Sequence, residues 1–112
     1  MKVQIKSSAP NVELVELSGE LDFHSSPEVR AAFTAPVEKQ LKKILIDLTK
    51  VGYIDSSGLA TFVELFQKLK RHGGKLILFN LSPSVRSVFE IAKLDGIFKL
   101  AGSEKDALSL VS

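Results

Sequence analysis

Two almost uninterrupted apolar runs, KILIDL (43–48) and KLILFN (75–80), constrain the fold of this chain more than any other feature. Such runs are typical of strands that are buried on both faces of a parallel sheet. The segment between them carries apolar residues at helical spacing, which predicts an amphipathic helix with one buried stripe. These residues are Leu59, Phe62, Val63, Phe66 and Leu69. Because parallel strands joined by helices form right-handed crossovers, the sequence predicts an α/β domain.

The remainder of the chain continues the alternation of strands and helices. Further strands are expected at 2–6, 12–18 and 97–100, and further helices within 25–41, 81–94 and 103–111. Ser26 and Ser82 each precede a proline, so both are expected to cap a helix. Pro36 lies inside the first of these helices and is expected to kink or split it.

The predicted order is β-β-α-β-α-β-α-β-α. It implies a mixed, mostly parallel sheet of four to five strands with about four helices. The first two strands follow each other closely, so we expect a hairpin in which the N-terminal strand is antiparallel. The length of 112 residues suits one compact domain, and residues 1–112 are therefore expected to form a single unit.

Composition excludes several classes of function. The chain contains no cysteine, which excludes disulfides and thiolate metal sites. Its net charge is only +2, and the basic cluster at 68–75 lies at a predicted helix end, so no nucleic acid partner is expected. The first ten residues lack the apolar run of a signal peptide, and no apolar stretch approaches a membrane span. We therefore expect a cytoplasmic protein without membrane insertion.

Three loops follow the carboxyl ends of predicted parallel strands, where open α/β sheets hold their ligands. They are GELDFHSS (19–26), TKVGYIDSSG (49–58) and NLSPS (80–84). If the strands are neighbours, these loops lie on one edge of the sheet and bring Asp22 and His24 near Ser56. Ser82 would then lie at the same edge.

The segment DSSGL (55–59) opens the long central helix. The unpaired N–H groups and the dipole at a helix start favour a phosphate, so a phosphoryl group on Ser56 would be stabilised there. In a simpler interpretation, Asp55 or Ser56 only caps the helix. Gly58 favours the first interpretation. Glycine in a first turn costs up to about 1 kcal/mol relative to alanine, whereas it lets a partner approach the backbone closely.

Catalytic and metal-binding interpretations have little support in the sequence. Ser56, His24 and an aspartate could form a hydrolase triad, but the serine does not lie in a G-x-S-x-G elbow. Two well-separated histidines and scattered acids show no metal-ligand spacing. The glycines at 73–74 close a helix and do not open one, so they are not expected to cradle a phosphate. We expect no catalytic residue, no metal, no cofactor and no enzymatic activity.

The stretch from LIDL (45–48) to IFKL (97–100), which contains DSSGL, resembles the STAS domain of bacterial anti-sigma factor antagonists. GELD in the loop at 19–26 resembles the second-strand loop of that family, and the likeness extends from about residue 3 to residue 110. In that family the serine directly after the aspartate is phosphorylated, a position that Ser56 occupies here.

The resemblance also implies roles for neighbouring residues. Ser57 matches the flanking hydroxyl, and Asp22 matches the acid that helps present the serine to its kinase. Ala60 departs from the pattern, since many members have glycine there. The residues expected to bind a partner are Asp22, His24, Asp55, Ser57, Gly58, Leu59 and Ser82.

The resemblance implies a partner-switching protein. The unmodified form would bind an anti-sigma factor that is also an ATP-dependent serine kinase, and would so release the sigma factor. Phosphorylation of Ser56 would end the binding, and a metal-dependent serine phosphatase would restore it. 

A second function is compatible with the same residues. A STAS subunit can dock on a transporter, such as a lipid-exporting ABC complex, and use the same helix as a static protein-binding face. The intact acceptor serine favours the regulator without excluding the transporter subunit. A monomer is expected, because no long coiled coil or exposed apolar stripe demands a dimer.

Overall fold

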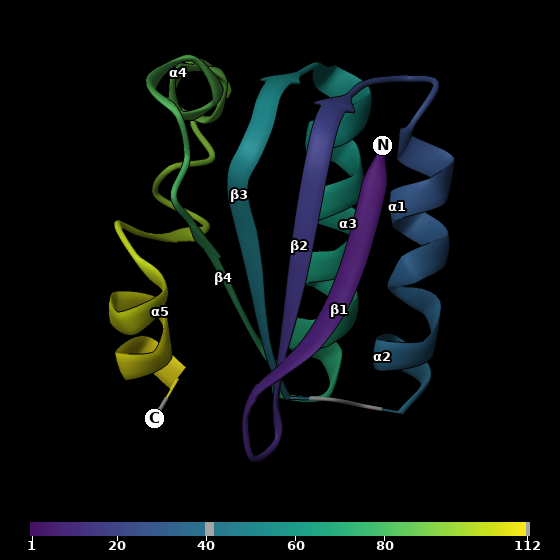
Figure 1. The fold of residues 1–112 in the computed structure, drawn as a ribbon, viewed down its shortest axis with the longest axis vertical. Helices are drawn as coiled ribbons and strands as arrows, with labels where there is room; N and C mark the ends of the chain where they lie inside the picture. Colours follow the sequence, from purple (N-terminus) through teal and green to yellow (C-terminus); the bar gives the residue numbers. More distant parts are fainter. Residues whose placement is uncertain (40–41, 112) are drawn as a thin grey trace.

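A five-stranded sheet organises the chain in the computed structural model, which describes residues 1–39 and 42–111 (Figure 1). The strands follow one another across the sheet in the order β1-β2-β3-β4-β5. Their bounds are β1 Lys2–Ala9, β2 Val12–Leu21, β3 Lys43–Ile54, β4 Lys75–Phe79 and β5 Lys99–Ala101. The strand β1 pairs with β2 antiparallel, and the other three pairings are parallel. The predicted mixed α/β fold, with its N-terminal antiparallel strand, is therefore confirmed.

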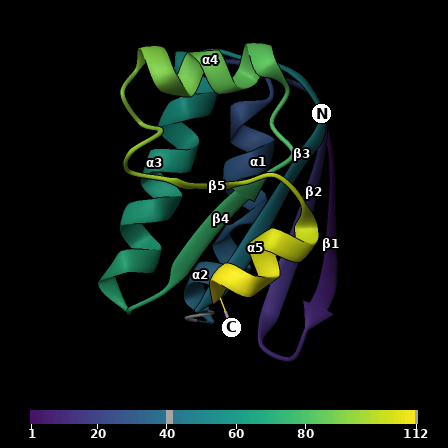
Figure 2. The ribbon, with the colours of Figure 1, turned by 90° about the vertical axis from the view of Figure 1, so that its left-hand side faces the viewer.

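Helices cover both faces of this sheet. Their bounds are α1 Ser26–Ala32, α2 Thr34–Glu38, α3 Ser56–Arg71, α4 Pro83–Ile91 and α5 Glu104–Val111. Side chains of α1, α3 and α4 belong to the larger apolar cluster on one face, whereas α5 contributes to a smaller cluster on the other. In Figure 2, α5 lies in front of the strands and α1 lies behind them. The result is a three-layer domain in which the sheet is the middle layer.

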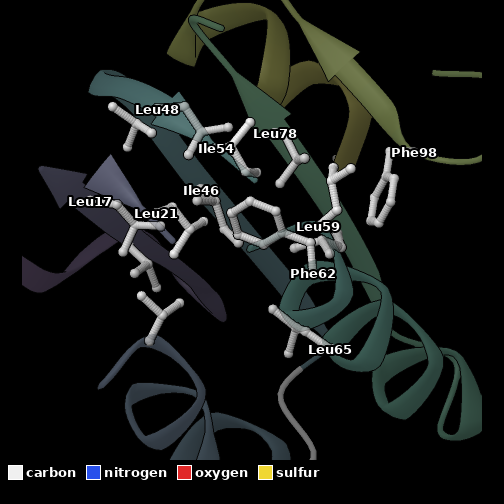
Figure 3. Close-up of a cluster of buried hydrophobic side chains, with 14 of the residues drawn as sticks. Leu17, Leu21, Ile46, Leu48, Ile54, Leu59, Phe62, Leu65, Leu78 and Phe98 are labelled. Atoms are coloured by element: carbon white, nitrogen blue, oxygen red, sulfur yellow. The ribbon is translucent and has the colours of Figure 1, made fainter. Parts of the chain in front are cut away.

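The strand β3 is buried on both faces, as its apolar run predicts. Ile46 and Leu48 belong to the larger cluster, which also contains Phe62 of α3 (Figure 3). Leu45 points the opposite way and joins Ile77 of β4 in the smaller cluster. Successive residues of a strand face opposite sides, so a strand between two helical layers must be apolar at nearly every position.

The helical segment after β2 is split, as Pro36 predicts, but the break lies before the proline. Phe33 separates α1 from α2, and Pro36 is the third residue of α2. The first N–H groups of a helix have no partner within it, so a proline in the first turn sacrifices no helical hydrogen bond. The predicted helix extends to 41, and its last two residues lie outside the described part of the chain.

The prediction that Ser26 caps α1 is wrong. The N-cap residue is Ser25, and the Ser26 hydroxyl instead donates to the carbonyl oxygen of Asp22 at 2.6 Å. Ser82 does cap α4, because its hydroxyl accepts from the Val85 N–H at 3.3 Å. The final strand spans 99–101 instead of the predicted 97–100.

Candidate functional site

The loops that follow β2 and β3 lie side by side at the carboxyl edge of the sheet, as the predicted topology requires. Leu21 and Ile54, the last residues of these strands, pair in register. The Asp55 N–H then donates to the Leu21 carbonyl oxygen at 3.1 Å, which continues the pairing by one hydrogen bond. Residues 22–25 and the start of α3 are therefore neighbours, although more than 30 positions separate them in the chain.

Asp55 connects the two loops through its carboxylate. One oxygen, Oδ1, accepts from the Gly58 N–H at 3.1 Å and so caps α3. The other, Oδ2, accepts from the backbone N–H of Phe23 at 3.2 Å. The sequence left open whether Asp55 or Ser56 is the cap, and the structure assigns that role to Asp55. Its second bond places the loop after β2 against the start of α3.

Asp22 shapes its own loop. Its Oδ1 accepts from the backbone N–H groups of His24 and Ser25, each at 3.0 Å. The Ser25 hydroxyl donates to the Glu20 carbonyl oxygen at 2.7 Å and ties the loop back to β2. The Ser25 N–H stabilises the charged form of Asp22 and, with smaller help from the Ser25 hydroxyl and from His24, lowers the pKa of this carboxyl below its usual range.

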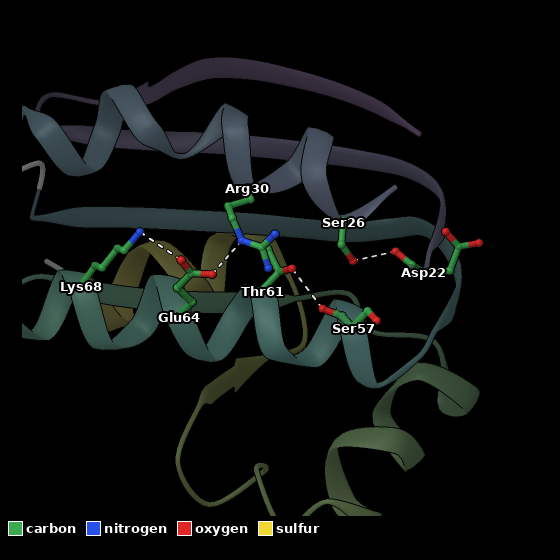
Figure 4. Close-up of polar contacts among 7 residues, drawn as sticks. All are labelled: Asp22, Ser26, Arg30, Ser57, Thr61, Glu64 and Lys68. Atoms are coloured by element: carbon green, nitrogen blue, oxygen red, sulfur yellow. Dashed lines mark hydrogen bonds and ion pairs between the residues drawn. The ribbon is translucent and has the colours of Figure 1, made fainter. Parts of the chain in front are cut away.

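Ser56 is the first residue of α3, and it is exposed. Because Asp55 caps the helix, the Ser56 hydroxyl is not needed for that purpose. Ser57 is half-buried, and its carbonyl oxygen accepts from the Thr61 hydroxyl at 3.0 Å (Figure 4). Of the two adjacent serines, Ser56 is therefore the more exposed residue.

The reason predicted for Gly58 is wrong. Gly58 is buried, and a Cβ built on it would lie 2.8 Å from Ile54 Cγ1, from Leu21 Cγ and from the Leu21 carbonyl oxygen. The close approach that requires glycine is therefore made by the domain itself and not by a partner. Leu59, also predicted at the partner surface, is only 9% exposed and belongs to the core. Gly58 and Leu59 are both buried, so neither residue offers surface for docking.

His24 and Phe23 extend from the loop after β2. Both are exposed, and their rings meet edge to face with centroids 5.8 Å apart. Phe23 is 71% exposed, which makes it the residue of this edge that the sequence analysis missed. The available signal was a phenylalanine inside the mostly polar loop sequence GELDFHSS. The apolar periodicity of helices and strands does not account for an aromatic residue in a loop.

Ser82 directly precedes α4, and this helix lies at the same end of the molecule as the loops after β2 and β3 (Figure 2). Its hydroxyl caps α4 and also contacts the Ser84 hydroxyl at 3.2 Å. Within residues 1–39 and 42–111, no group of three or more His, Asp or Glu side chains is placed to hold a metal ion.

A charged groove lies below this edge, between α1, α2 and α3. Glu64 of α3 accepts from Arg30 Nε at 2.8 Å and from Lys68 Nζ at 3.1 Å (Figure 4). The Arg30 guanidinium, followed by Lys68, lowers the pKa of Glu64. Apolar residues such as Phe33 and Leu65 also line the groove, whose volume is about 270 Å³. Glu38 also lines the groove, so two carboxylates balance the two cations and the groove carries little excess charge.

Comparisons with known proteins agree with this architecture. The sequence matches the STAS domain family over residues 5–107. It is 33% identical to the anti-sigma-B factor antagonist of Listeria monocytogenes over 104 residues, which covers 93% of this chain and 91% of that protein. No helix in the described part of the chain combines the length and apolar character needed to span a bilayer.

Solved structures show the same likeness. An anti-sigma factor antagonist from Mycobacterium paratuberculosis superposes with a TM-score of 0.89 at 27% identity and covers 98% of this chain and 92% of its own. The Bacillus cell fate determinant SpoIIAA, solved in its phosphorylated form, superposes with a TM-score of 0.77 at 26% identity. That match covers 99% of this chain and 100% of SpoIIAA.

Proposed function

Because this chain belongs to the STAS domain family, we propose that it is an anti-sigma factor antagonist that is switched off by phosphorylation of Ser56. The unmodified protein binds an anti-sigma factor through the loop at 22–24 and the start of α3. The observation that carries the proposal is the exposure of Ser56, whose hydroxyl is not needed as the helix cap because Asp55 performs that role. The sequence similarity to the Listeria protein, an anti-sigma-B factor antagonist, supports the proposal.

Electrostatics explain how one modification could switch binding. A phosphoryl group adds about −1.5 to −2 charges at neutral pH. On Ser56 it would lie beside the carboxylate of Asp55, with Asp22 across the adjoining loop. Like charges brought together in an interface cost several kcal/mol, and every 1.4 kcal/mol is about tenfold in affinity. A switch of about a hundredfold is therefore within reach.

The free domain tolerates the same charge. The first turn of α3 supplies N–H groups and the positive end of the helix dipole, which stabilise a phosphate. We therefore expect phosphorylation to change the surface charge with little change in backbone structure. The structure of SpoIIAA in its phosphorylated form supports a stable modified state in a protein of this fold.

The partners follow from the same proposal. The anti-sigma factor is an ATP-dependent serine kinase that modifies Ser56, and a metal-dependent serine phosphatase removes the phosphate. Both reactions take place in the cytoplasm. The chain itself contributes the acceptor hydroxyl and the docking surface, and it has no catalytic role.

Phosphate transfer tests the proposal directly. Each anti-sigma-type ATPase encoded by the source organism would be purified and incubated with the chain and ATP, and the intact mass would be measured. We expect a gain of one phosphoryl group with one of them. Ser56→Ala should abolish the gain and keep binding, whereas Ser57→Ala is the matched control and should leave the gain intact.

Two results would overturn the proposal. One is the absence of modification by every ATPase shown to be active on another substrate. The other is loss of modification in Ser57→Ala with retention in Ser56→Ala, which would move the acceptor to the neighbouring serine. Stable binding to a transporter subunit without any modification would support the static docking function instead.

A further inference from the structure

Phe23 projects an aromatic ring into solvent beside the proposed phosphorylation site. Its 71% exposure is unusual for a residue of this size, because phenyl rings are normally buried. The residue lies in the loop after β2, and its backbone N–H donates to Asp55 Oδ2. Asp55 directly precedes Ser56, so the backbone that carries the exposed ring is bonded to the residue next to the exposed acceptor serine.

The backbone that carries Phe23 is held on both sides. Before it, the Asp22 N–H donates to the Ser25 hydroxyl at 2.9 Å. After it, the N–H groups of His24 and Ser25 donate to Asp22 Oδ1. The Ser26 N–H then donates to the Asp22 carbonyl oxygen at 2.9 Å and leads the chain into α1. These bonds leave the side chain as the mobile part, so docking the ring would cost little backbone entropy.

Exposed aromatic side chains on a well-held backbone are the type of residue that dominates protein interfaces. Aromatic rings bury a large area for the loss of only two side-chain torsions, and they cluster at the centre of interfaces. The Phe23 N–H is bonded to Asp55, the residue before Ser56, so a partner that reaches Ser56 meets this loop as well. A matching surface would offer an apolar pocket for the ring.

We propose that Phe23 is the apolar anchor by which this chain docks onto its anti-sigma factor, with the ring inserted into an apolar pocket of that partner. This proposal rests on the proposed function and adds the residue that supplies most of the binding energy. It also explains the position of the switch, since a phosphate on Ser56 would lie at the margin of the anchored ring.

Ile91 provides a matched control. It is 82% exposed and lies at the C-terminal end of α4, so it is another large apolar side chain in solvent. It differs from Phe23 in lying outside the loops that adjoin Ser56. Removing it tests whether any exposed apolar residue contributes to binding or whether the position beside Ser56 is decisive.

The experiment measures the affinity of the unphosphorylated chain for the purified ATPase that phosphorylates Ser56. We expect Phe23→Ala to weaken binding by about 30-fold or more, the effect of removing an interface hot spot. Phe23→Trp should retain binding within about threefold, because it keeps an aromatic anchor. Ile91→Ala should leave the affinity unchanged. The rate of phosphorylation should show a raised KM and an unchanged kcat for Phe23→Ala, because the anchor docks the protein without touching the acceptor oxygen.

The outcomes separate the anchor from the proposed function. If Phe23→Ala binds and is modified like the wild type, the anchor is refuted and the proposed function is untouched. If no ATPase binds or modifies the wild type, the proposed function itself fails. Thermal unfolding checks that Phe23→Ala is folded, and Phe23→Gln replaces it if alanine disturbs the loop. An equal loss of affinity in Ile91→Ala would also refute the specific role of Phe23.

Discussion

Replacing Gly58 by alanine tests how the start of α3 is attached to the sheet. The added Cβ would lie 2.8 Å from two side-chain carbons and from the Leu21 carbonyl oxygen, whereas ordinary contacts begin at 3.4 Å. The neighbours must therefore give way by about 0.6 Å. A side chain can rotate away, but the Leu21 carbonyl oxygen also accepts the Asp55 N–H at 3.1 Å, so moving it strains the bond that joins the two loops.

The size of the effect follows from two opposing terms. Overpacking of a core costs about 1–3 kcal/mol. Alanine has the better helix propensity, which returns at most about 1 kcal/mol. We therefore expect Gly58→Ala to lower the free energy of unfolding by about 1–2 kcal/mol, which corresponds to a fall in Tm of about 4–8 °C for a domain of this size.

Urea unfolding followed by far-UV circular dichroism would measure this loss. Gly52→Ala is the matched control, because Gly52 is exposed in β3 and its added Cβ would meet nothing within 4 Å. That variant should stay within about 0.5 kcal/mol of the wild type. Equal stability of the two variants would refute the packing argument and would restore the idea that Gly58 keeps the surface clear for a partner.

Three further predictions concern the polar groups around the site. Asp55→Ala should lose about 1–2 kcal/mol of stability, because it removes a helix cap and the acceptor of the Phe23 N–H, whereas Asp55→Asn should lose less; equal losses in urea unfolding would contradict this. The lowered pKa of Asp22 means that its contribution to stability is complete above a pH of about 4, the unfolded value, and is lost as the pH falls through the folded value. The stability difference between wild type and Asp22→Asn should therefore shrink on acidification, and a difference independent of pH would exclude this account. Glu64→Gln should cost less than about 1 kcal/mol, since its ion pairs with Arg30 and Lys68 are exposed; a loss above about 2 kcal/mol in the same assay would show that the network is more than a surface feature.

Much of the fold could be read from periodicity. The apolar runs at 43–48 and 75–80 became β3 and β4, and the helical stripe between them became α3. Placement of Ser56 at the start of this helix followed from the same pattern. Details that depend on contacts outside the helix did not follow, such as the break at Phe33 and the start of α1 after Ser25, whose side chain makes no capping hydrogen bond.

The sequence predicted the position of the site more accurately than the contacts within it. Strand direction alone put the loops of Asp22 and Asp55 at one edge of the sheet, and the structure joins them there through the Phe23 N–H. The reason for Gly58 was misjudged, because the sequence shows that a close approach is needed but not which group makes it. Phe23 was missed, because exposure is a property of the folded surface.

Local rules thus determined the elements of this protein, because apolar spacing, capping residues and prolines act between neighbours in the chain. They also determined that Ser56 begins α3, one residue after its aspartate. Only the tertiary structure decided which groups satisfy each other across the sheet edge: that Asp55 caps the helix and holds Phe23, and that Leu21 and Ile54 fill the space a side chain at Gly58 would need. The physical reason is that hydrogen bonds and packing between distant segments depend on where the folded backbone places them, and a linear pattern does not contain those distances.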